Sequence, residues 1–396
     1  AVDLLCEHFR RGSRIVVVGD FDADGATSTA LVVRQMRRLG FKHVDFLVPN
    51  RFQYGYGLTP EIVQLAAEGK PGLIVTVDNG ISSHAGVAAA TSLGIETLIT
   101  DHHLAPATVP AANAIVNPNA PGDTFPSKAL AGVGVAFYLM AALTRAMQDR
   151  GLCANPPAIA ELLDLVALGT VADLVPLDRN NRVLVHQGLR RIRAGRCVAG
   201  IHALVEAANC IPSQVVAAHL GFQIGPRLNA AGRLDDMSIG IQCLLTDDPN
   251  MARMLAARLT QLNSDRKELE LQMQQEALMA IADMRAEDPQ LPLGLCLFDE
   301  SWHQGVVGLV ASRVKERVNR PVIALARADA TTLKGSARSV SGVHIRDVLD
   351  AVATRHPGLI DKFGGHAMAA GLTLPAATLE VFRAEFDAEV RRWMSI

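Results

Sequence analysis

Short apolar runs alternate along the first part of the chain with segments in which apolar residues recur at helical spacing. Four runs read as strands buried in a parallel sheet, at residues 15–18, 44–48, 73–77 and 96–100. Helices are predicted before and between them, at residues 1–10, 27–39, 60–68 and 85–93. Because strand and helix alternate, we predict an α/β fold with a doubly wound, mostly parallel sheet.

Further along the chain the pattern becomes helical and then returns to mixed strand and helix. A proline-rich connection with little periodicity covers residues 104–130. Helices are predicted at 130–147 and 160–172 and through most of 182–245. A single helical pattern from 248 to 286 has no glycine or proline after Pro249, so we interpret it as a stiff linker.

The last hundred residues predict a second, smaller α/β domain. Its expected elements are strands at 293–298 and 322–326, helices at 306–318, 344–354 and 376–393, a short strand or loop at 334–340, and a glycine loop at 362–372. The chain therefore divides into a first domain with a helical subdomain (1–247), a connecting helix (248–291) and a second domain (292–396).

Acidic and imidazole side chains follow three of the predicted strands. Asp20, Asp22 and Asp24 follow the first strand, Asp78 follows the third, and Asp101, His102 and His103 follow the fourth. Residues two apart on extended backbone share a face, so we expect the first three carboxylates to point the same way before Gly25 turns the chain into a helix. Like charges this close need a cation. Ligands of such sheets bind at the carboxyl ends of the strands.

Asp173 ends the apolar helix predicted at 160–172 and completes a set of candidate metal ligands. The set comprises five carboxylates and one imidazole: Asp20, Asp22, Asp24, Asp78, His102 and Asp173. Two divalent ions bridged by a carboxylate need about this many ligands, and such a pair promotes phosphoryl displacement by water. Mixed carboxylate and imidazole ligands favour two Mn²⁺ ions, with Mg²⁺ as a substitute.

Side chains next to the candidate metal ligands have their own predicted roles. Neighbouring residues on extended backbone point apart, so His103 is expected to face the substrate phosphate while His102 binds metal. Asp101 is expected to orient an imidazole from behind.

Several residues outside this set are candidates for binding phosphate. Ser336 and Arg338, together with Arg51, are placed to clamp a phosphate, and Gly364 and Gly365 with His366 form a loop whose N–H groups can cradle one. A polar turn is predicted at 225–236, and it contains Arg227, Asn229 and Arg233. These residues could contact phosphate, contact the other domain, or belong to an ordinary solvated loop, and the sequence leaves all three interpretations open.

Composition excludes several classes of protein. With 49% hydrophobic and 20% charged residues the chain is a compact globular protein, and 396 residues are too many for one ordinary core. The net charge of −2 requires any nucleic-acid binding to come from a local basic patch. Six cysteines without a CxxC pair fit a reducing cytoplasm, and no apolar stretch is long enough to span a membrane. The chain begins at Ala1, which suggests a piece of a longer protein.

The motifs together resemble the DHH phosphoesterase superfamily. GDFDADG, TVDNG, TDHH and GTVADLVPL match its four metal-site motifs in order. The second domain is similar to the DHH-associated (DHHA1) domain through WHQGVVGLVASRVKER, KGSARS and KFGGHAMAAGL. PNRFQYGYGL, LAGVGVAFYLM and GPRLNAAGRLDDM are similar to stretches of the RecJ exonucleases within the superfamily.

The resemblance implies a substrate, a reaction and partners. It implies a 5′→3′ exonuclease of DNA recombination and repair that releases nucleotide 5′-monophosphates. Single-stranded DNA with a free 5′ end would lie in a groove between the two domains, with Arg51, Ser336 and Arg338 at its terminal phosphate. His303 and Gln304, in the WHQ motif, join the candidate nucleic-acid contacts. The implied protein partners are a single-strand-binding protein and a helicase.

Two alternatives stay open on the sequence. One is an enzyme of the same superfamily that cleaves short oligonucleotides or cyclic dinucleotides; the other is a non-catalytic replication scaffold that keeps the fold. Members of the RecJ family usually continue into an OB-fold domain and a further C-terminal region, whereas this chain stops at Ile396. Affinity for the DNA strand and processivity are therefore the properties expected to differ from those of family members with these further domains.

Overall fold

A computed structural model describes residues 1–50, 54, 57–287 and 291–394. Contacts divide the chain into two compact units, Ala1–Asn263 and Ser264–Ile396. The division falls inside one long helix, α12 (Pro249–Glu287), so each half of this helix packs with a different unit. The domain limits drawn from the sequence placed this helix between the domains as a linker, and they remain predictions.

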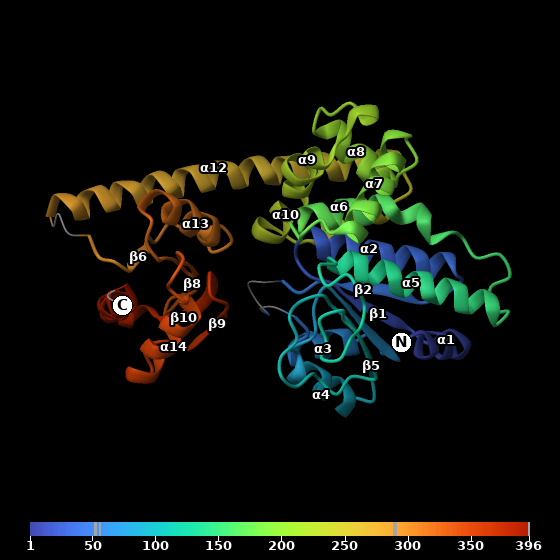
Figure 1. Ribbon diagram of the computed structural model, residues 1–396, viewed down its shortest axis with the longest axis horizontal. Coiled ribbons are helices and arrows are strands. Elements are labelled where there is room, and N and C mark those ends of the chain that lie inside the picture. The colour runs from blue at the N-terminus through green and yellow to red at the C-terminus, as the bar shows by residue number, and fades with distance from the viewer. Residues whose placement is uncertain (51–53, 55–56, 288–290, 395–396) are drawn as a thin grey trace. The chain divides into compact units, whose positions relative to one another are not determined.

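The first unit contains a five-stranded parallel sheet with helices on both faces (Figure 1). Its strands are β1 (Ile15–Val18), β2 (Val44–Leu47), β3 (Leu73–Val77), β4 (Glu96–Thr100) and β5 (Ala114–Val116). The helices that cover it are α2 (Ala23–Arg38), α3 (Pro60–Ala67), α4 (His84–Ser92) and α5 (Gly132–Asp149). Helix α1 (Val2–Arg11) packs against α5, and α6 (Leu163–Ala172) packs against α2 and α5.

Successive side chains along a strand point to opposite faces of the sheet, so this unit has one apolar core on each face. Ile15 and Val17 of β1 belong to the core on the side of α2 and α5, whereas Val16 and Val18 belong to the core on the side of α3 and α4. All four residues are buried, as a strand covered on both faces requires. The predicted doubly wound parallel sheet is therefore confirmed.

Two local predictions in this unit were wrong. The proline-rich connection contains strand β5, which is only three residues long and pairs with β4, so it carries too little periodicity to be read from the sequence. Helix α2 begins at Ala23, before Gly25, so the chain does not stay extended through Asp24.

A helical region follows the sheet and packs against α2 and α6. It consists of α7 (Arg179–Arg193), α8 (Ala199–Ala207), α9 (Ala217–His219), α10 (Gly225–Leu234) and α11 (Ser238–Leu245), with short 3₁₀ turns at Ile159–Leu162 and Pro212–Gln214. A π-helical turn, Leu220–Ile224, leads directly into α10. The sequence predicted this region to be helical, and it is.

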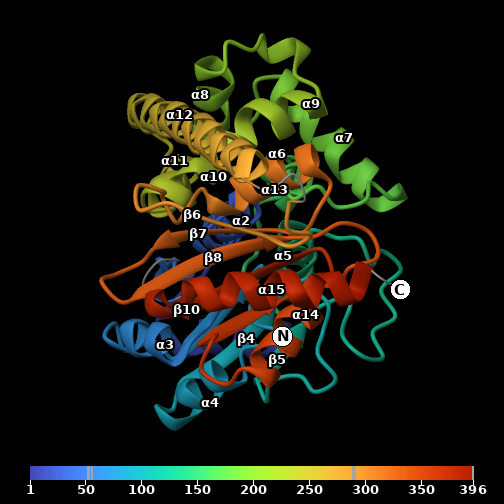
Figure 2. The ribbon, with the colours of Figure 1, turned by 90° about the vertical axis from the view of Figure 1, so that its left-hand side faces the viewer.

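The second unit contains another five-stranded sheet, of order β6-β7-β8-β10-β9. Only β6 and β7 run parallel. Its elements are β6 (Leu295–Phe298), α13 (Val307–Val318), β7 (Val322–Arg327), β8 (Thr332–Arg338), α14 (Ile345–Arg355), β9 (Lys362–Gly365), β10 (Ala369–Pro375), a 3₁₀ turn (Ala376–Thr378) and α15 (Leu379–Met394). Figure 2 shows α15 across one face of this sheet. Phe382 and Phe386 of α15 belong to the same buried apolar cluster as Ile323 and Leu325 of β7.

The glycine loop predicted at 362–372 is a β-hairpin instead. Gly364 and Gly365 lie on β9, which pairs antiparallel with β10. Glycine-rich sequence favours a turn on propensity, but pairing with neighbouring strands overrides that weak preference. The structure also contains no membrane-spanning candidate among its described helices, since none combines sufficient length with sufficient apolar character.

Candidate metal centre

The candidate ligands gather where the strand order of the first sheet reverses. The order β2-β1-β3-β4-β5 places β1 beside β3, and the chain leaves these neighbouring strands in opposite directions across the sheet. Such a switch point opens a crevice at the carboxyl ends of the strands. Asp20 follows β1, Asp78 follows β3, and Asp101 and His102 follow β4. Three adjacent strands therefore deliver the three predicted clusters to one edge.

The first acidic segment is a helix start rather than an extended strand. Asp22 is the N-cap of α2, and its Oδ1 accepts a hydrogen bond of 2.9 Å from the Gly25 N–H. Asp24 lies in the first helical turn, where a negative charge is favoured by the helix dipole. The expectation that alternation on a strand would align the three carboxylates was wrong, although they do reach the same site.

Gly25 is needed for close packing rather than for a turn. A Cβ at this position would lie 2.6 Å from the carbonyl oxygen of Asp20, a backbone atom that has little freedom to move. The missing side chain lets the first turn of α2 fold back against the end of β1. This contact keeps Asp20 and Asp24 near one another.

Asp24 is held by the start of helix α5. Its Oδ2 accepts a hydrogen bond of 2.6 Å from the Gly132 N–H, and its Oδ1 accepts one of 2.9 Å from the Val133 N–H. A Cβ on Gly132 would lie 2.6 Å from Oδ1 of Asp78. Gly132 thus serves two carboxylates, a role the sequence analysis missed because a glycine inside an apolar helical pattern carries no signal of its own.

Asp78 adopts an unusual backbone conformation, with φ at +63°. Few residues other than glycine take this left-handed conformation, and among them aspartate and asparagine are enriched. The next residue, Asn79, fixes the turn by donating hydrogen bonds to the carbonyls of Val18 and Val77 at 3.2 and 2.9 Å. The turn therefore ties β3 to β1 and aims Asp78 at the crevice.

His102 lies at the centre of the cluster. Its Nε2 is 3.1 Å from Oδ1 of Asp78, 3.6 Å from Oδ2 of Asp173 and 4.0 Å from Oδ2 of Asp24. Asp173 is the residue that follows α6, as the sequence predicted. The imidazole therefore meets carboxylates from three separate elements.

The possible ligand atoms form overlapping groups of three in which all atoms lie within 4.8 Å of one another. One group is Asp20, Asp22 and Asp78, and another is Asp24, His102 and Asp173. A third group, Asp78 with His102 and His103, overlaps both. Asp78 belongs to the first and third groups, so its carboxylate could contribute ligand atoms to either part of the cluster.

Burial raises the proton affinity of these carboxylates. Burial, followed by the charge of Asp22, raises the pKa of Asp24 to about 7. Burial, followed by the charge of Asp24, raises the pKa of Asp173 to about 8 and that of Asp78 well above its ordinary value. Burial and the nearby charge of His103 lower the pKa of His102 to about 4, so its imidazole is neutral at pH 7.

The donor set fits divalent ions. His102 Nε2 and Asp173 Oδ2 are buried and have no hydrogen-bond partner in the described part of the chain. Buried polar atoms of this kind are costly unless something binds them. Carboxylates with a neutral imidazole match Mn²⁺, and the oxygen-rich group around Asp20 and Asp22 also suits Mg²⁺.

Asp101 and His103 form a pair beside the ligands. Oδ1 of Asp101 accepts hydrogen bonds from the His102 N–H at 2.7 Å and the His103 N–H at 3.1 Å, and lies 2.7 Å from His103 Nδ1. Burial alone would lower the pKa of His103, but the Asp101 contact outweighs it and raises the pKa to about 9. Asp101 therefore favours the charged form of His103. Its predicted task of orienting an imidazole beside the metal stays a prediction.

The polar turn predicted at 225–236 is helix α10, and its residues have different surroundings. Asn229 accepts a hydrogen bond of 2.7 Å from the Ala23 N–H and so supports the first turn of α2. Arg227 bonds to Thr260 of α12 at 3.1 Å and to the carbonyls of Gln223 and Ala207. Arg233 is half-buried in the last turn of α10. Arg51 lies outside the described residues.

The second unit brings its predicted phosphate contacts onto one patch of sheet. Gly371 of β10 lies between Ser336 of β8 and Gly364 of β9 in the strand register. Arg338 donates to Ser312 Oγ at 3.1 Å, and burial lowers the pKa of its guanidinium. A Cβ added to Gly364 would meet nothing within 4 Å, so the backbone there is accessible.

The remaining candidates of this unit lie on neighbouring segments. His303 is half-buried, accepts a hydrogen bond of 3.1 Å from the Gly305 N–H, and precedes the half-buried Gln304. Gly365 lies on β9 and His366 follows it, exposed. Their roles in binding stay predictions.

Comparison with known proteins identifies the family. Residues 14–170 match the DHH family, N-terminal domain, and residues 292–392 match the DHHA1 domain. The single-stranded-DNA-specific exonuclease RecJ of Salmonella typhimurium is 58% identical over 398 residues, which cover 100% of this chain and 69% of that protein. The chain belongs to the RecJ family. The RecJ protein of Escherichia coli K12 is 57% identical with the same coverage.

Solved structures agree with this assignment. A crystal structure of exonuclease RecJ bound to manganese is 36% identical, with a TM-score of 0.84 and coverage of 99% of this chain and 93% of that one. A structure of RecJ from Thermus thermophilus in complex with Mg²⁺ has 33% identity and a TM-score of 0.74, and covers 99% of this chain and 52% of that one. The resemblance of the motifs to the DHH superfamily and its DHHA1 domain is therefore confirmed.

Proposed function

We propose that this chain is a metal-dependent exonuclease that hydrolyses the phosphodiester bonds of single-stranded DNA. The observation that carries the proposal is the cluster around His102, in which Asp24, Asp78 and Asp173 converge from three elements. Relatives named as single-stranded-DNA-specific exonucleases match the whole chain, beyond the metal motifs alone. No observation favours short oligonucleotides or cyclic dinucleotides, and the complete ligand set argues against a non-catalytic scaffold.

The side chains have separate tasks in this proposal. The carboxylates of Asp20, Asp22, Asp24, Asp78 and Asp173, with the His102 imidazole, would hold two Mn²⁺ ions or, as substitutes, Mg²⁺. When bound, such a pair supplies activation of water at neutral pH and neutralisation of charge on the phosphate. His103 keeps its proton through the contact of its Nδ1 with Asp101, and its other ring nitrogen, Nε2, would donate a hydrogen bond to a phosphate oxygen.

The direction of cleavage and the grip on the strand extend the proposal. Release of nucleotide 5′-monophosphates from a 5′ end follows from the family resemblance, with Ser336 and Arg338 as contacts of the terminal phosphate. The alignment of Ser336 with Gly364 across β10 supports a phosphate on this patch. We further propose that the chain acts in DNA repair and recombination in the cytoplasm. Its proposed protein partners are a single-strand-binding protein and a helicase. Six cysteines without a disulfide among them agree with that compartment.

A labelled oligonucleotide tests the proposal. With Mn²⁺ present, a single-stranded 5′-labelled substrate should release labelled mononucleotide at once, whereas a 3′-labelled one should shorten progressively. Asp78→Asn is the inactive control. Endonucleolytic fragments, or mononucleotide released first from the 3′ label, would contradict the assigned reaction or its direction.

A further inference from the structure

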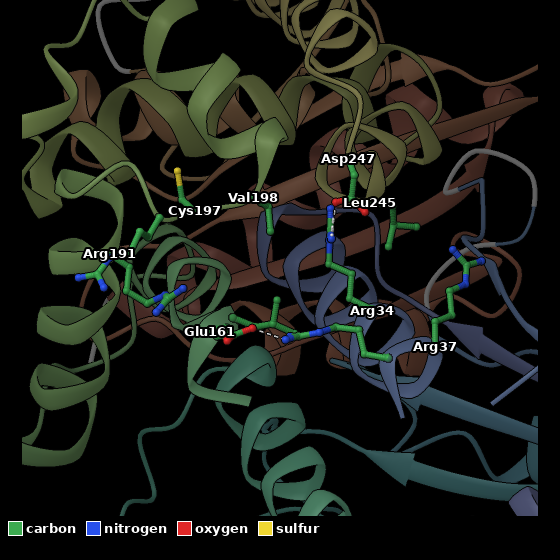
Figure 3. A pocket seen from close by; sticks show the side chains of 11 residues that line it. Arg34, Arg37, Glu161, Arg191, Cys197, Val198, Leu245 and Asp247 are labelled. Atoms are coloured by element: carbon green, nitrogen blue, oxygen red, sulfur yellow. Dashed lines mark hydrogen bonds and ion pairs between the residues drawn. The ribbon is translucent and has the colours of Figure 1, made fainter. Parts of the chain in front are cut away.

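A basic hollow lies on the first unit, apart from the metal centre. It has a volume of about 560 Å³ and is lined by five arginines and two acidic residues (Figure 3). Arg34 and Arg37 come from α2 and Arg191 comes from α7, while Arg196 lies just beyond the end of α7. For a chain with a net charge of −2, this is a strong local concentration of positive charge.

The hollow stands at the opposite end of two helices from the metal ligands. Asp24 is in the first turn of α2, and Arg37 is 13 residues later, which is about 20 Å along a helix that rises 1.5 Å per residue. Leu162, beside the start of α6, lines the hollow, whereas Asp173 follows the end of α6. A ligand here would therefore not touch the metal centre.

The arginines of the hollow differ in what they already bind. Each nitrogen of the Arg34 guanidinium donates a hydrogen bond, to the carbonyls of Leu244 and Thr246 and to Asp247 at 2.8 Å. The charge of Arg191 interacts favourably with the buried carboxyl of Asp164, but its Nε is buried and has no hydrogen-bond partner among the described residues. The side chain of Arg196 has no ion pair within the part of the chain that the structure describes, and it is exposed. It is costly to leave the buried Nε–H of Arg191 without a hydrogen-bond acceptor.

A second hollow shares these two arginines. It has a volume of about 510 Å³, and Arg190 and Arg193 line it together with Arg191 and Arg196. Basic residues in the last turn of α7 complement the helix dipole. That explains Arg190 and Arg193, but it explains neither the buried, unpaired nitrogen of Arg191 nor Arg196, which lies outside the helix.

We propose that the two hollows form a second anion site, which binds a ligand carrying two or more phosphate groups. Every cation lining them is an arginine, whose planar fork matches phosphate oxygens. None of the described residues that line them is aromatic, so the site contacts phosphates and does not stack bases. The phosphates belong either to a free nucleotide or polyphosphate or to the backbone of a nucleic-acid strand.

Two carboxylates that line the first hollow already pair with two of its arginines. Glu161 pairs with Arg38, and Asp247, whose side chain is 87% exposed, pairs with Arg34. These exposed acids occupy guanidiniums that a phosphate would otherwise use. Removing one of them should therefore strengthen ligand binding, which is the opposite of what removing an arginine does.

Calorimetry with inorganic triphosphate tests the site on the 396-residue chain stripped of divalent ions. Arg196→Ala should weaken binding about tenfold or more, and so should Arg191→Ala. Asp247→Asn should strengthen it about two- to fivefold. Arg179→Ala, which removes an exposed arginine of the same helix outside both hollows, is the matched control and should change nothing.

Competition identifies the source of the phosphates. A nucleoside triphosphate that binds more tightly than inorganic triphosphate indicates a free nucleotide. A 12-mer of single-stranded DNA that inorganic triphosphate displaces, and that Arg196→Ala releases, indicates a strand backbone. Triphosphate binding that is absent, or equal in Arg196→Ala and the parent chain, overturns the proposal. Binding of an acidic peptide in place of triphosphate overturns it too. Since Arg196 is exposed, this variant keeps the test valid even if Arg191→Ala fails to fold.

Discussion

At the scale of single residues, the candidate site depends on carboxylates that are buried before any ion binds. Asp24 and Asp78 are each no more than 2% exposed. Isolated charges at such positions would be strongly unfavourable, so protons or cations must compensate them. The raised pKa values of Asp24, Asp78 and Asp173 express that cost.

Asp78→Asn should abolish metal-dependent cleavage while leaving the fold intact. Asparagine tolerates the positive φ of this position, so the turn survives, but the shared ligand loses its charge. Because metal-assisted stabilisation of the transition state amounts to several kcal/mol, we expect cleavage of single-stranded DNA to fall about 10³-fold or more. Normal turnover, with unchanged circular dichroism, would rule out Asp78 as a ligand.

Asp101→Asn should lower the pKa of His103 toward its ordinary value. The hydrogen bond from His103 to Asp101 is the largest of the contributions that raise this pKa to about 9. NMR titration of the imidazole in metal-free protein measures the change directly. An unshifted His103 would mean that Asp101 does not control its charge.

At the scale of elements, the ends of helices position the ligands. Asp22 caps α2, Asp173 follows α6, and the first N–H groups of α5 bind Asp24. These elements pack tightly because glycines allow it at Gly25 and Gly132. The metal centre therefore depends on how α2, α5 and α6 meet, and not only on the strand ends.

Gly132→Ala should weaken Mn²⁺ binding about 10- to 100-fold, the range seen when groups that orient metal ligands are removed. The new Cβ would lie 2.6 Å from Oδ1 of Asp78 and would push the start of α5 away from Asp24. Gly134→Ala is the matched control on the same helix. Its Cβ would meet a flexible end of Leu130 at 2.8 Å. Equal losses in both variants, measured by calorimetry, would contradict a specific role for Gly132.

At the scale of the whole molecule, the protonation of the candidate site makes the free energy of unfolding depend on pH and on metal binding. Between pH 6.5 and 8 the folded, metal-free chain retains protons on Asp24 (pKa about 7), Asp173 (about 8) and His103 (about 9). Unfolded carboxyls and imidazoles have ordinary values near 4 and 6.5, so the unfolded chain has lost most of these protons. The folded state therefore binds more protons in this window. His102, with its lowered pKa of about 4, acts in the opposite sense wherever the unfolded imidazole still holds protons, mainly below about pH 7.5, and so offsets only a small part of the effect.

The free energy of unfolding of metal-free protein should consequently fall by a few kcal/mol as pH rises from 6.5 to 8. Mn²⁺ should reverse the loss, and its stabilising effect should be larger at pH 8, because the ligands must be deprotonated to bind it. Denaturant titrations at both pH values, with and without Mn²⁺, measure this. Metal-free protein that becomes more stable toward pH 8 would show that the carboxyls are already ionised.

The sequence by itself determined the parallel sheet, the two-unit plan and the identity of the candidate ligands. Continuous apolar runs mark strands covered on both faces, and acids that follow such strands are placed at one edge by the parallel arrangement itself. Asp78 and His102 could be brought together on this ground, whereas Asp173 was added as the carboxylate that ends an apolar helix. These are consequences of local pattern and general topology.

Only the tertiary structure decided how the ligands are held and where the second anion site lies. Strand periodicity placed Asp24 wrongly, because a capping side chain at Asp22 started the helix earlier than the apolar pattern showed. Gly132 owes its role to its own backbone N–H, which donates a hydrogen bond to Asp24. Asn229 owes its role to its side-chain oxygen, which accepts a hydrogen bond from the Ala23 N–H. Arg34, Arg191 and Arg196 form one hollow although they are separated by up to 162 residues. Such contacts depend on packing between elements, which no local spacing encodes.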